Sequence, residues 1–232
     1  MRVTACFVLL GLVIGGGLLA LAQAPAKTGW VDRFDVDKKD FVSVGANDYF
    51  RLEPGAFLVL EKGKERLVIT VLDETRPVDG VETRVVEERE TKNGQLVEVS
   101  RNFFAFNTAD RGVYYFGEEV DIYKNGKVVR HEGAWESGKN GARFGLMVPG
   151  RPEAGTRFYQ EIAPGVAMDR ARTVSVDTSI RTPAGEFKGC LEFVETSPLE
   201  PLARDTKIYA PGIGLVRDGS LLLVRHGRKE EK

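Results

Sequence analysis

The sequence predicts an all-β protein, a single antiparallel meander of about ten to twelve strands curved into a barrel or half-barrel. Three observations predict this fold. Extended runs rich in valine, isoleucine, leucine, threonine and phenylalanine recur along the chain, short glycine-containing turns separate them, and little or no helix is expected outside the N-terminal leader. A sheet of this size must curve or close, because long open edges invite aggregation.

The first 26 residues have the layout of a secretory signal peptide. Arg2 precedes an uncharged apolar stretch from Val3 to Ala22, and small residues with a proline follow. We expect cleavage after Ala26, with cleavage after Ala24 as the second choice. An uncut anchor is the alternative, because the apolar run approaches the ~20 residues that span a bilayer. The sequence therefore predicts export to the periplasm or the extracellular space, with membrane contact only through an uncleaved leader.

The rest of the chain, residues 27–232, is long enough for one β domain. Without Arg2 it has 32 basic residues against 34 acidic ones, which offers no electrostatic footprint for nucleic acid. Cys190 is its only cysteine, so no intramolecular disulfide is expected. We expect Cys190 to be a buried thiol within a strand.

Residues 56–132 read as successive hairpins. The runs turn at three places: Gly63, Asn93-Gly94 and Asn125-Gly126. Asn-Gly is a strong hairpin signal, because both central residues of a type I′ turn need positive φ. Apolar side chains alternate along these runs, as at Leu67, Ile69 and Val71, which suits a sheet with one buried face.

A stretch rich in glycine and proline, residues 138–156, interrupts this pattern. We interpret it as a long connection that forms a flap over the open end of one curved sheet, because long loops in compact domains are often functional. Two separate domains are the less economical alternative, since each half would have a marginal core. The strand pattern resumes after residue 157, with a turn at Pro183-Ala184-Gly185.

The stretch YAPGIGLVRDGSLLLV, residues 209–224, resembles a phosphate-binding loop at first sight. The dinucleotide fingerprint needs a third glycine three residues after the second, followed by a helix. Here Gly219 comes five residues after Gly214, and strand-forming residues follow. We therefore predict a hairpin at Asp218-Gly219, a bulged turn around Gly212 and Gly214, and no cofactor.

The segments TPAGEFKGCLEFVET and YAPGIGLVRDG, in the C-terminal third, resemble secreted bacterial β-domains related to the periplasmic lipoprotein carriers. That resemblance implies a curved half-barrel with an apolar concave face, and a carrier function. Those carriers usually have helices that plug the concavity, whereas this sequence predicts none.

A partial calcium-loop motif occurs in DIYKNGKVVRHE. Asp121, Asn125 and Glu132 stand at ligand positions of that loop, but Tyr123 occupies another, and the loop needs a helix on each side. We therefore predict no metal site and keep these three residues as the alternative.

Aromatic residues gather around the 138–156 connection and predict a ligand groove. Phe144 and Met147 are expected to point inward toward Trp135 and Tyr159, with arginines at the rim. The candidate ligand-binding residues are Tyr115, Trp135, Phe144, Met147, Tyr159, Arg143 and Arg151. The alternative is that the aromatic residues simply fill the core of the sheet.

These observations predict an exported, non-enzymatic β domain that binds or carries a hydrophobic or amphipathic molecule, such as a lipid, in the cell envelope. One alternative is a structural or assembly protein that binds another envelope protein. Another is a hydrolase with acidic catalytic residues, for which the carboxylates of Glu118, Glu119 and Asp121 are available. An apolar cavity would favour the first function, an exposed apolar sheet face the second, and two facing buried carboxylates the third.

Overall fold

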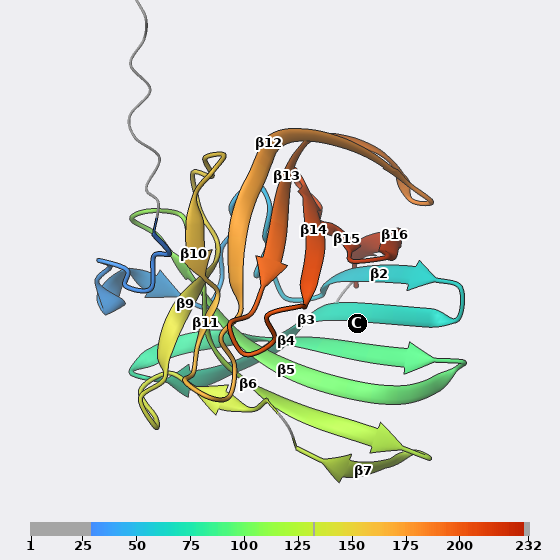
Figure 1. The fold of residues 1–232 in the computed structure, drawn as a ribbon, viewed down its shortest axis with the longest axis horizontal. Helices are drawn as coiled ribbons and strands as arrows, with labels where there is room; N and C mark the ends of the chain where they lie inside the picture. The colour runs from blue at the N-terminus through green and yellow to red at the C-terminus, as the bar shows by residue number, and fades with distance from the viewer. Residues whose placement is uncertain (1–28, 132, 230–232) are drawn as a thin grey trace, which may run out of the picture.

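The computed structural model describes residues 29–131 and 133–229, so the predicted leader lies outside the described residues. In this part of the chain, sixteen antiparallel strands form one sheet that curves into a nearly closed barrel (Figure 1). The helical content described is one 3-10 turn, η1 (Lys38–Asp40). The predicted all-β barrel is confirmed.

The strand count exceeds the predicted ten to twelve. Five of the described strands have four residues or fewer: β1 (Phe41–Val42), β7 (Lys127–Arg130), β8 (Trp135–Glu136), β10 (Arg157–Tyr159) and β11 (Glu161–Ile162). They arise where the chain bends and changes its pairing partner, and a sequence run that short carries no strand signal.

Five consecutive hairpin-linked strands form the first half of the barrel: β2 (Ala56–Lys62), β3 (Glu65–Val78), β4 (Val81–Lys92), β5 (Gln95–Asn107) and β6 (Val113–Lys124). Asn93 and Gly94 have φ of 53° and 75°, and Asn125 and Gly126 have 53° and 74°. These positive values confirm the turns predicted at both Asn-Gly pairs.

Five more consecutive strands form the second half: β12 (Arg170–Thr182), β13 (Gly185–Thr196), β14 (Arg204–Ala210), β15 (Gly214–Asp218) and β16 (Leu221–Arg228). The predicted hairpin at Asp218-Gly219 joins β15 to β16, and a register shift between Ile208 and Tyr209 marks the predicted bulge. β16 pairs with β2, so the two halves form one continuous wall.

The segment 138–156 is not the flap that we expected. Six of its residues form β9 (Arg143–Val148), which pairs with β6 and β11 as part of the wall. Gly145 permits this, because its backbone lies directly against Gln160: a Cβ at position 145 would meet the Gln160 carbonyl oxygen at 2.2 Å.

One short segment, residues 157–162, connects the two ends of the sheet. Its first part, β10, pairs with β12, and its second part, β11, pairs with β9. Gln160 stands between the two parts, and its N–H donates to the carbonyl of Asp169. The segment therefore completes the barrel by changing partner midway.

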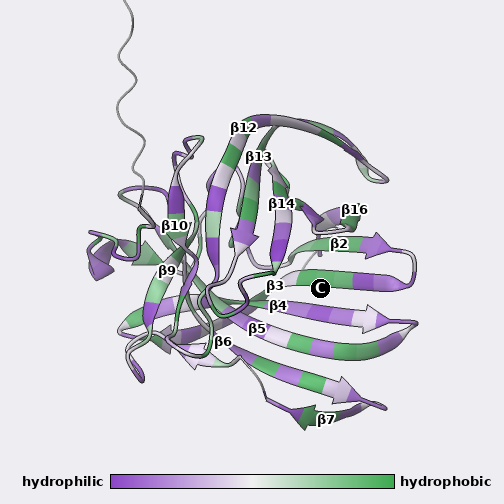
Figure 2. Ribbon diagram, viewed as in Figure 1, coloured by the Kyte–Doolittle hydropathy of each residue, from purple (hydrophilic) through white to green (hydrophobic). Residues whose placement is uncertain are grey.

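Two apolar cores lie on the two faces of β3 to β6, which carry alternating apolar and polar residues (Figure 2). Phe104 and Tyr115 face the barrel interior, whereas Phe103 and Phe116 face outward and are covered by the N-terminal segment. Gly117 provides a bulge between these strands, with φ of 143°. The bulge bends the sheet, and this bend leaves an interior space.

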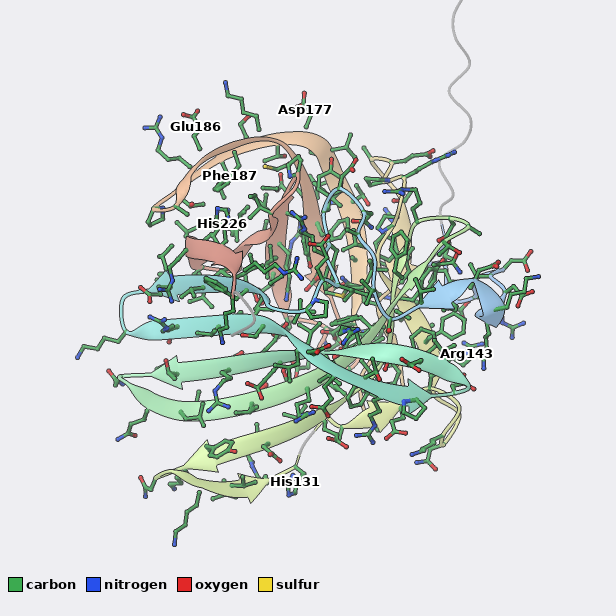
Figure 3. All side chains as sticks on the ribbon, turned by 180° about the vertical axis from the view of Figure 1, so that it is seen from behind. His131, Arg143, Asp177, Glu186, Phe187 and His226 are labelled. Carbon is green, nitrogen blue, oxygen red and sulfur yellow. The ribbon has the colours of Figure 1, made fainter. Side chains whose placement is uncertain are left out.

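The β12–β13 hairpin extends beyond β14 and arches back over the barrel. At its tip the Ala184 N–H donates to the Leu223 carbonyl of β16 at 3.1 Å. Figure 3 shows Phe187 beneath the arch, on the side of His226. Cys190 at the base of the arch is fully buried, as expected.

Replacing Gly94 or Gly126 by valine is expected to destabilise the protein by about 1 kcal/mol or more, because positive φ is costly for a β-branched residue. No atom lies within 4 Å of a Cβ at either position, so the change in stability reports backbone strain and not a steric clash. Urea unfolding gives the effect. Gln95→Val, at an exposed position beside the first turn, is the control and should change stability by less than about 0.5 kcal/mol.

Candidate ligand-binding cavity

A cavity of about 460 Å³ lies inside the barrel. Its wall is mostly apolar and includes Phe50, Leu58, Ile69, Val86, Phe104 and Leu215. These residues come from both halves of the barrel, where alternation along each strand turns every second side chain inward. The volume and the apolar wall are typical of small-molecule pockets.

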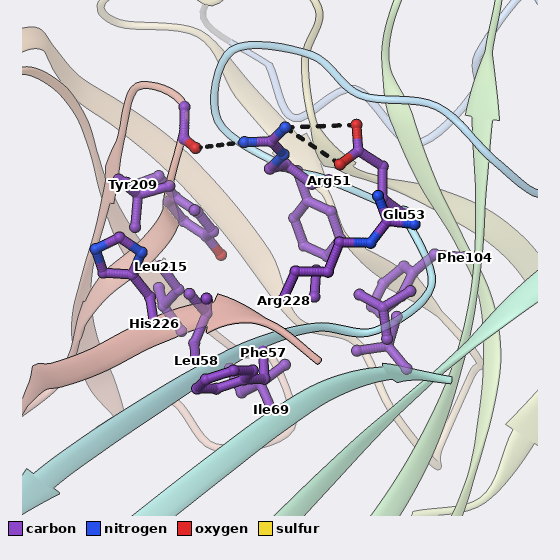
Figure 4. A pocket seen from close by; sticks show the side chains of 18 of the residues that line it. Arg51, Glu53, Phe57, Leu58, Ile69, Phe104, Tyr209, Leu215, His226 and Arg228 are labelled. Carbon is purple, nitrogen blue, oxygen red and sulfur yellow. Dashed lines mark hydrogen bonds and ion pairs between the residues drawn. The ribbon is translucent and has the colours of Figure 1, made fainter. Parts of the chain in front are cut away.

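The mouth of the cavity lies where β15 and β16 diverge. These strands pair only near their hairpin, at Arg217 with Leu222 and at Asp218 with Leu221. Beyond it, β15 follows β14 and β16 follows β2. The mouth is lined on one side by residues 212–215 and on the other by residues 226–228 (Figure 4).

The loop of residues 43–55 packs across one end of the barrel. The Asn47 side-chain oxygen accepts hydrogen bonds from the N–H groups of Tyr49 and Phe50 at 2.9 and 2.8 Å, and its amide donates to the Arg111 carbonyl. Leu52 has no exposed surface. This network holds Phe50 in the cavity wall.

Two arginines at the mouth are engaged by this loop. Arg51 donates to the Gly212 carbonyl at 2.7 Å and forms an ion pair with Glu53 at 3.2 Å (Figure 4). Arg228 donates from Nε to the Pro54 carbonyl at 3.1 Å. Both guanidinium groups therefore fasten the loop to the rim.

The inner end of the cavity is charged. Lys207 Nζ lies 3.5 Å from Glu195 and 3.3 Å from Asp218, and Gln160 donates to Glu195 at 2.9 Å. Glu88 also lines the cavity. Burial raises the pKa of Glu88 to about 7, and the neighbouring Lys207 opposes this shift.

Tyr209 stands beside this cluster and lines the same cavity. Its side chain is 99% buried, and its hydroxyl has no hydrogen-bond partner among the described residues. A buried polar group without a hydrogen-bond partner costs free energy, so this hydroxyl lowers the stability of the folded protein.

Further carboxylates lie inside the barrel. Burial raises the pKa of Glu118 to about 7 and the pKa of Glu161 well above its usual range, and the charge of Glu118 adds to the shift of Glu161. The pKa values of Glu195 and Asp169 are also raised, mainly by burial. Within residues 29–131 and 133–229, no three acidic, histidine or cysteine side chains are placed to hold a metal ion.

Of the seven predicted ligand-binding residues, Met147 lines the cavity. Tyr115 and Trp135 belong to the barrel core, where Tyr115 stacks on Phe104 at 4.5 Å and meets Trp135 edge-on at 5.4 Å. They support the wall through Phe104 without lining the cavity.

The predicted inward position of Phe144 is wrong. Phe144 stacks on Phe116 at 5.0 Å in the outer core. The physical reason is that residues 143–148 form a strand, in which neighbouring side chains point to opposite faces.

The predicted arginine rim is not assembled either. Arg143 is exposed and bonds to Asp32 at 3.3 Å, and Arg151 is exposed. Tyr159 lies against Trp30, with ring centroids 6.1 Å apart, rather than beside Phe144. These side chains follow the outward-facing positions of their strands and loops, so they do not meet at the cavity.

Two of the three alternative metal ligands lie on the β6–β7 hairpin. Asp121 Oδ1 lies 2.7 Å from His131 Nδ1, Asn125 occupies the turn, and Glu132 lies outside the described residues.

The charged inner end of the cavity was not predicted from the sequence. Glu88 lies two residues after the buried Val86, and Lys207 lies two residues before Tyr209. This spacing places each pair on one face of a strand. The signal was therefore present, but a charged residue in a strand usually marks the solvent face.

Comparison of the chain with protein-family models, curated proteins and solved structures found no match. In the part of the chain that the structure describes, no helix has the length and hydrophobicity needed to cross a membrane.

Proposed function

We propose that this protein binds one hydrophobic or amphipathic molecule inside its barrel and carries it in the cell envelope. The observation that carries the proposal is the cavity of about 460 Å³, with its apolar wall and a few polar groups at the inner end. Export rests on the signal-peptide pattern, and carriage is also what the resemblance to periplasmic lipoprotein carriers implies.

The two alternative functions have weaker support. Exposed large apolar side chains among the described residues are spread over several elements, such as Val129 on β7 and the neighbouring Val174 and Val176 on β12, and form no extended apolar sheet face. Glu118 and Glu161 are partly buried carboxylates, but burial raises the pKa of both. An acid and its partner carboxylate need pKa values that are shifted apart.

The proposal predicts saturable binding of a fluorescent hydrophobic probe, with a stoichiometry of one, to protein freed of bound lipid. Ile69→Trp places a large ring in the cavity and should weaken binding at least tenfold. Val68→Trp, on the opposite face of the same strand, is the matched control and should leave affinity unchanged.

Binding without saturation, or equal weakening by both tryptophan variants, would refute an interior site. Native mass spectrometry of the protein from its own host complements the titration, because a carrier is expected to retain an apolar molecule when it is purified.

A further inference from the structure

The inner end of the cavity contains a carboxylate without a partner. Glu88 lines the cavity, and no hydrogen bond or ion pair joins its carboxylate to another described residue. Tyr209 also lines the cavity, but its hydroxyl is buried out of reach of a ligand. A donor group of a ligand placed beside Glu88 would meet an unpaired acceptor.

The charge around Glu88 is unbalanced. Lys207 is the basic residue of the cluster, and its ion pairs are with Glu195 and Asp218, at 3.5 and 3.3 Å, rather than with Glu88. The charge of Lys207 lowers the pKa of Glu88, but burial and the charges of Asp218, Glu90 and Glu98 raise it, and the net shift is upward.

The mouth carries positively charged arginines, but their guanidinium groups already have partners. Arg51 bonds to Glu53 and to the Gly212 carbonyl, and Arg228 bonds to the Pro54 carbonyl. These contacts hold the loop of residues 43–55 in place. The unpaired carboxylate of the cavity therefore lies at its inner end rather than at its rim.

On the basis of the proposed ligand cavity, we propose that its inner end binds the protonated amino group of an amphipathic amine. The ammonium group donates hydrogen bonds to the Glu88 carboxylate, and the apolar chain lies along Ile69, Phe104 and Leu215 toward the mouth. This orientation reverses the sequence-based expectation of a polar head among arginines.

The alternative head groups fit less well. A carboxylate or phosphate would add negative charge beside Glu88, Glu195 and Asp218, which repel it. A neutral hydroxyl would satisfy the hydrogen bonds but leave the charge of Glu88 unbalanced. A protonated amine satisfies both requirements, and charge-assisted hydrogen bonds are the stronger kind.

The test compares dodecylamine, dodecanol and dodecanoate as competitors of the fluorescent probe at pH 8, where a simple amine is protonated. We expect dodecylamine to bind at least tenfold more tightly than the other two. Glu88→Gln should abolish this preference, whereas Tyr209→Phe, which removes a hydroxyl buried out of reach of the ligand, should retain it. Glu87→Gln, at the neighbouring position on the outer face of β4, is the matched control and should retain it.

Each outcome has a defined meaning. Equal affinities, tighter binding of dodecanoate, or a preference that survives in Glu88→Gln would overturn the amine site while leaving the cavity as a ligand site. Failure of the probe and of all three compounds to bind would overturn the proposed function itself. Circular dichroism of each variant ensures that only folded protein is compared.

Discussion

Replacing Gly145 by valine is expected to destabilise the protein by about 3 kcal/mol or more, because the new side chain has no room beside the backbone of Tyr159 and Gln160. A Cβ at this position would lie 2.2 Å from the Gln160 carbonyl oxygen and 2.8 Å from that of Tyr159. Backbone atoms cannot rotate away as a flexible side chain does. The segment 157–162, which joins the two ends of the sheet, must therefore move.

Urea unfolding of Gly145→Val, with Gly145→Ala as a milder variant, measures this effect. Arg143→Val is the matched control, since it adds the same β-branched residue to β9 at an exposed position. Its loss of the surface pair with Asp32 should cost less than about 1 kcal/mol. Equal unfolding midpoints for Gly145→Val and Arg143→Val would show that the closure is not tightly packed at Gly145.

Lowering the pH from 8 to 5.5 is expected to increase the free energy of unfolding by about 3 kcal/mol. Burial raises the pKa of Glu88 and Glu118 from 4.5 to about 7 in the folded protein. The folded state therefore binds more protons than the unfolded state between about pH 4.5 and 7, and stability falls as pH rises through this window. One pKa unit corresponds to about 1.4 kcal/mol, and partial solvent access reduces the sum for the two groups.

Carboxylates whose pKa is lowered in the folded protein affect its stability only below this pH range. The hydrogen bond and charge of Lys92 lower the pKa of Glu65, so any stability that this pair supplies is lost only as pH falls below the ordinary glutamate range. Urea unfolding at pH 5.5, 7 and 8 gives the profile. The double variant Glu88→Gln and Glu118→Gln should reduce the slope of the profile, leaving the part that comes from Glu161, Glu195 and Asp169, whereas Glu87→Gln should retain the full slope. A wild-type protein that loses stability between pH 8 and 5.5 would contradict the assignment.

The parts of the fold that depend on local sequence could be predicted. The Asn93-Gly94 and Asn125-Gly126 turns need only two residues with positive φ, and the observed angles have that sign. Bulged turns near Gly214 follow from the same local chemistry. Such features need no knowledge of distant partners.

The closure of the barrel depends on partners far apart in the chain, so it could not be predicted. Residues 157–162 pair with both β9 and β12, and no local sequence pattern predicts that a segment changes the strand with which it pairs. Residues 143–148 were predicted as part of a loop, and Phe144 was therefore predicted to point inward. In the strand β9 it points outward and stacks on Phe116.

The candidate site was only partly predictable for a related reason. Met147 was predicted to face inward because it is bulky and apolar, and it does line the cavity. Glu88 and Lys207 were missed, because a charged side chain in a strand normally points to solvent. Their inward position becomes clear only when the curved sheet encloses them.

From its long-range pairings, the segment of residues 157–162 is expected to take its place late in folding. Hairpins with short turns form early, whereas pairings across long stretches of chain must first overcome the entropy of loop closure. Val31 bonds to Arg157 and Tyr159, at 3.0 and 2.9 Å, so it is fixed only after residues 157–162 are in place. The start of the described chain is thus synthesised early but settles late, and the edges of β9 and β12 stay open to intermolecular pairing until that slow step is complete.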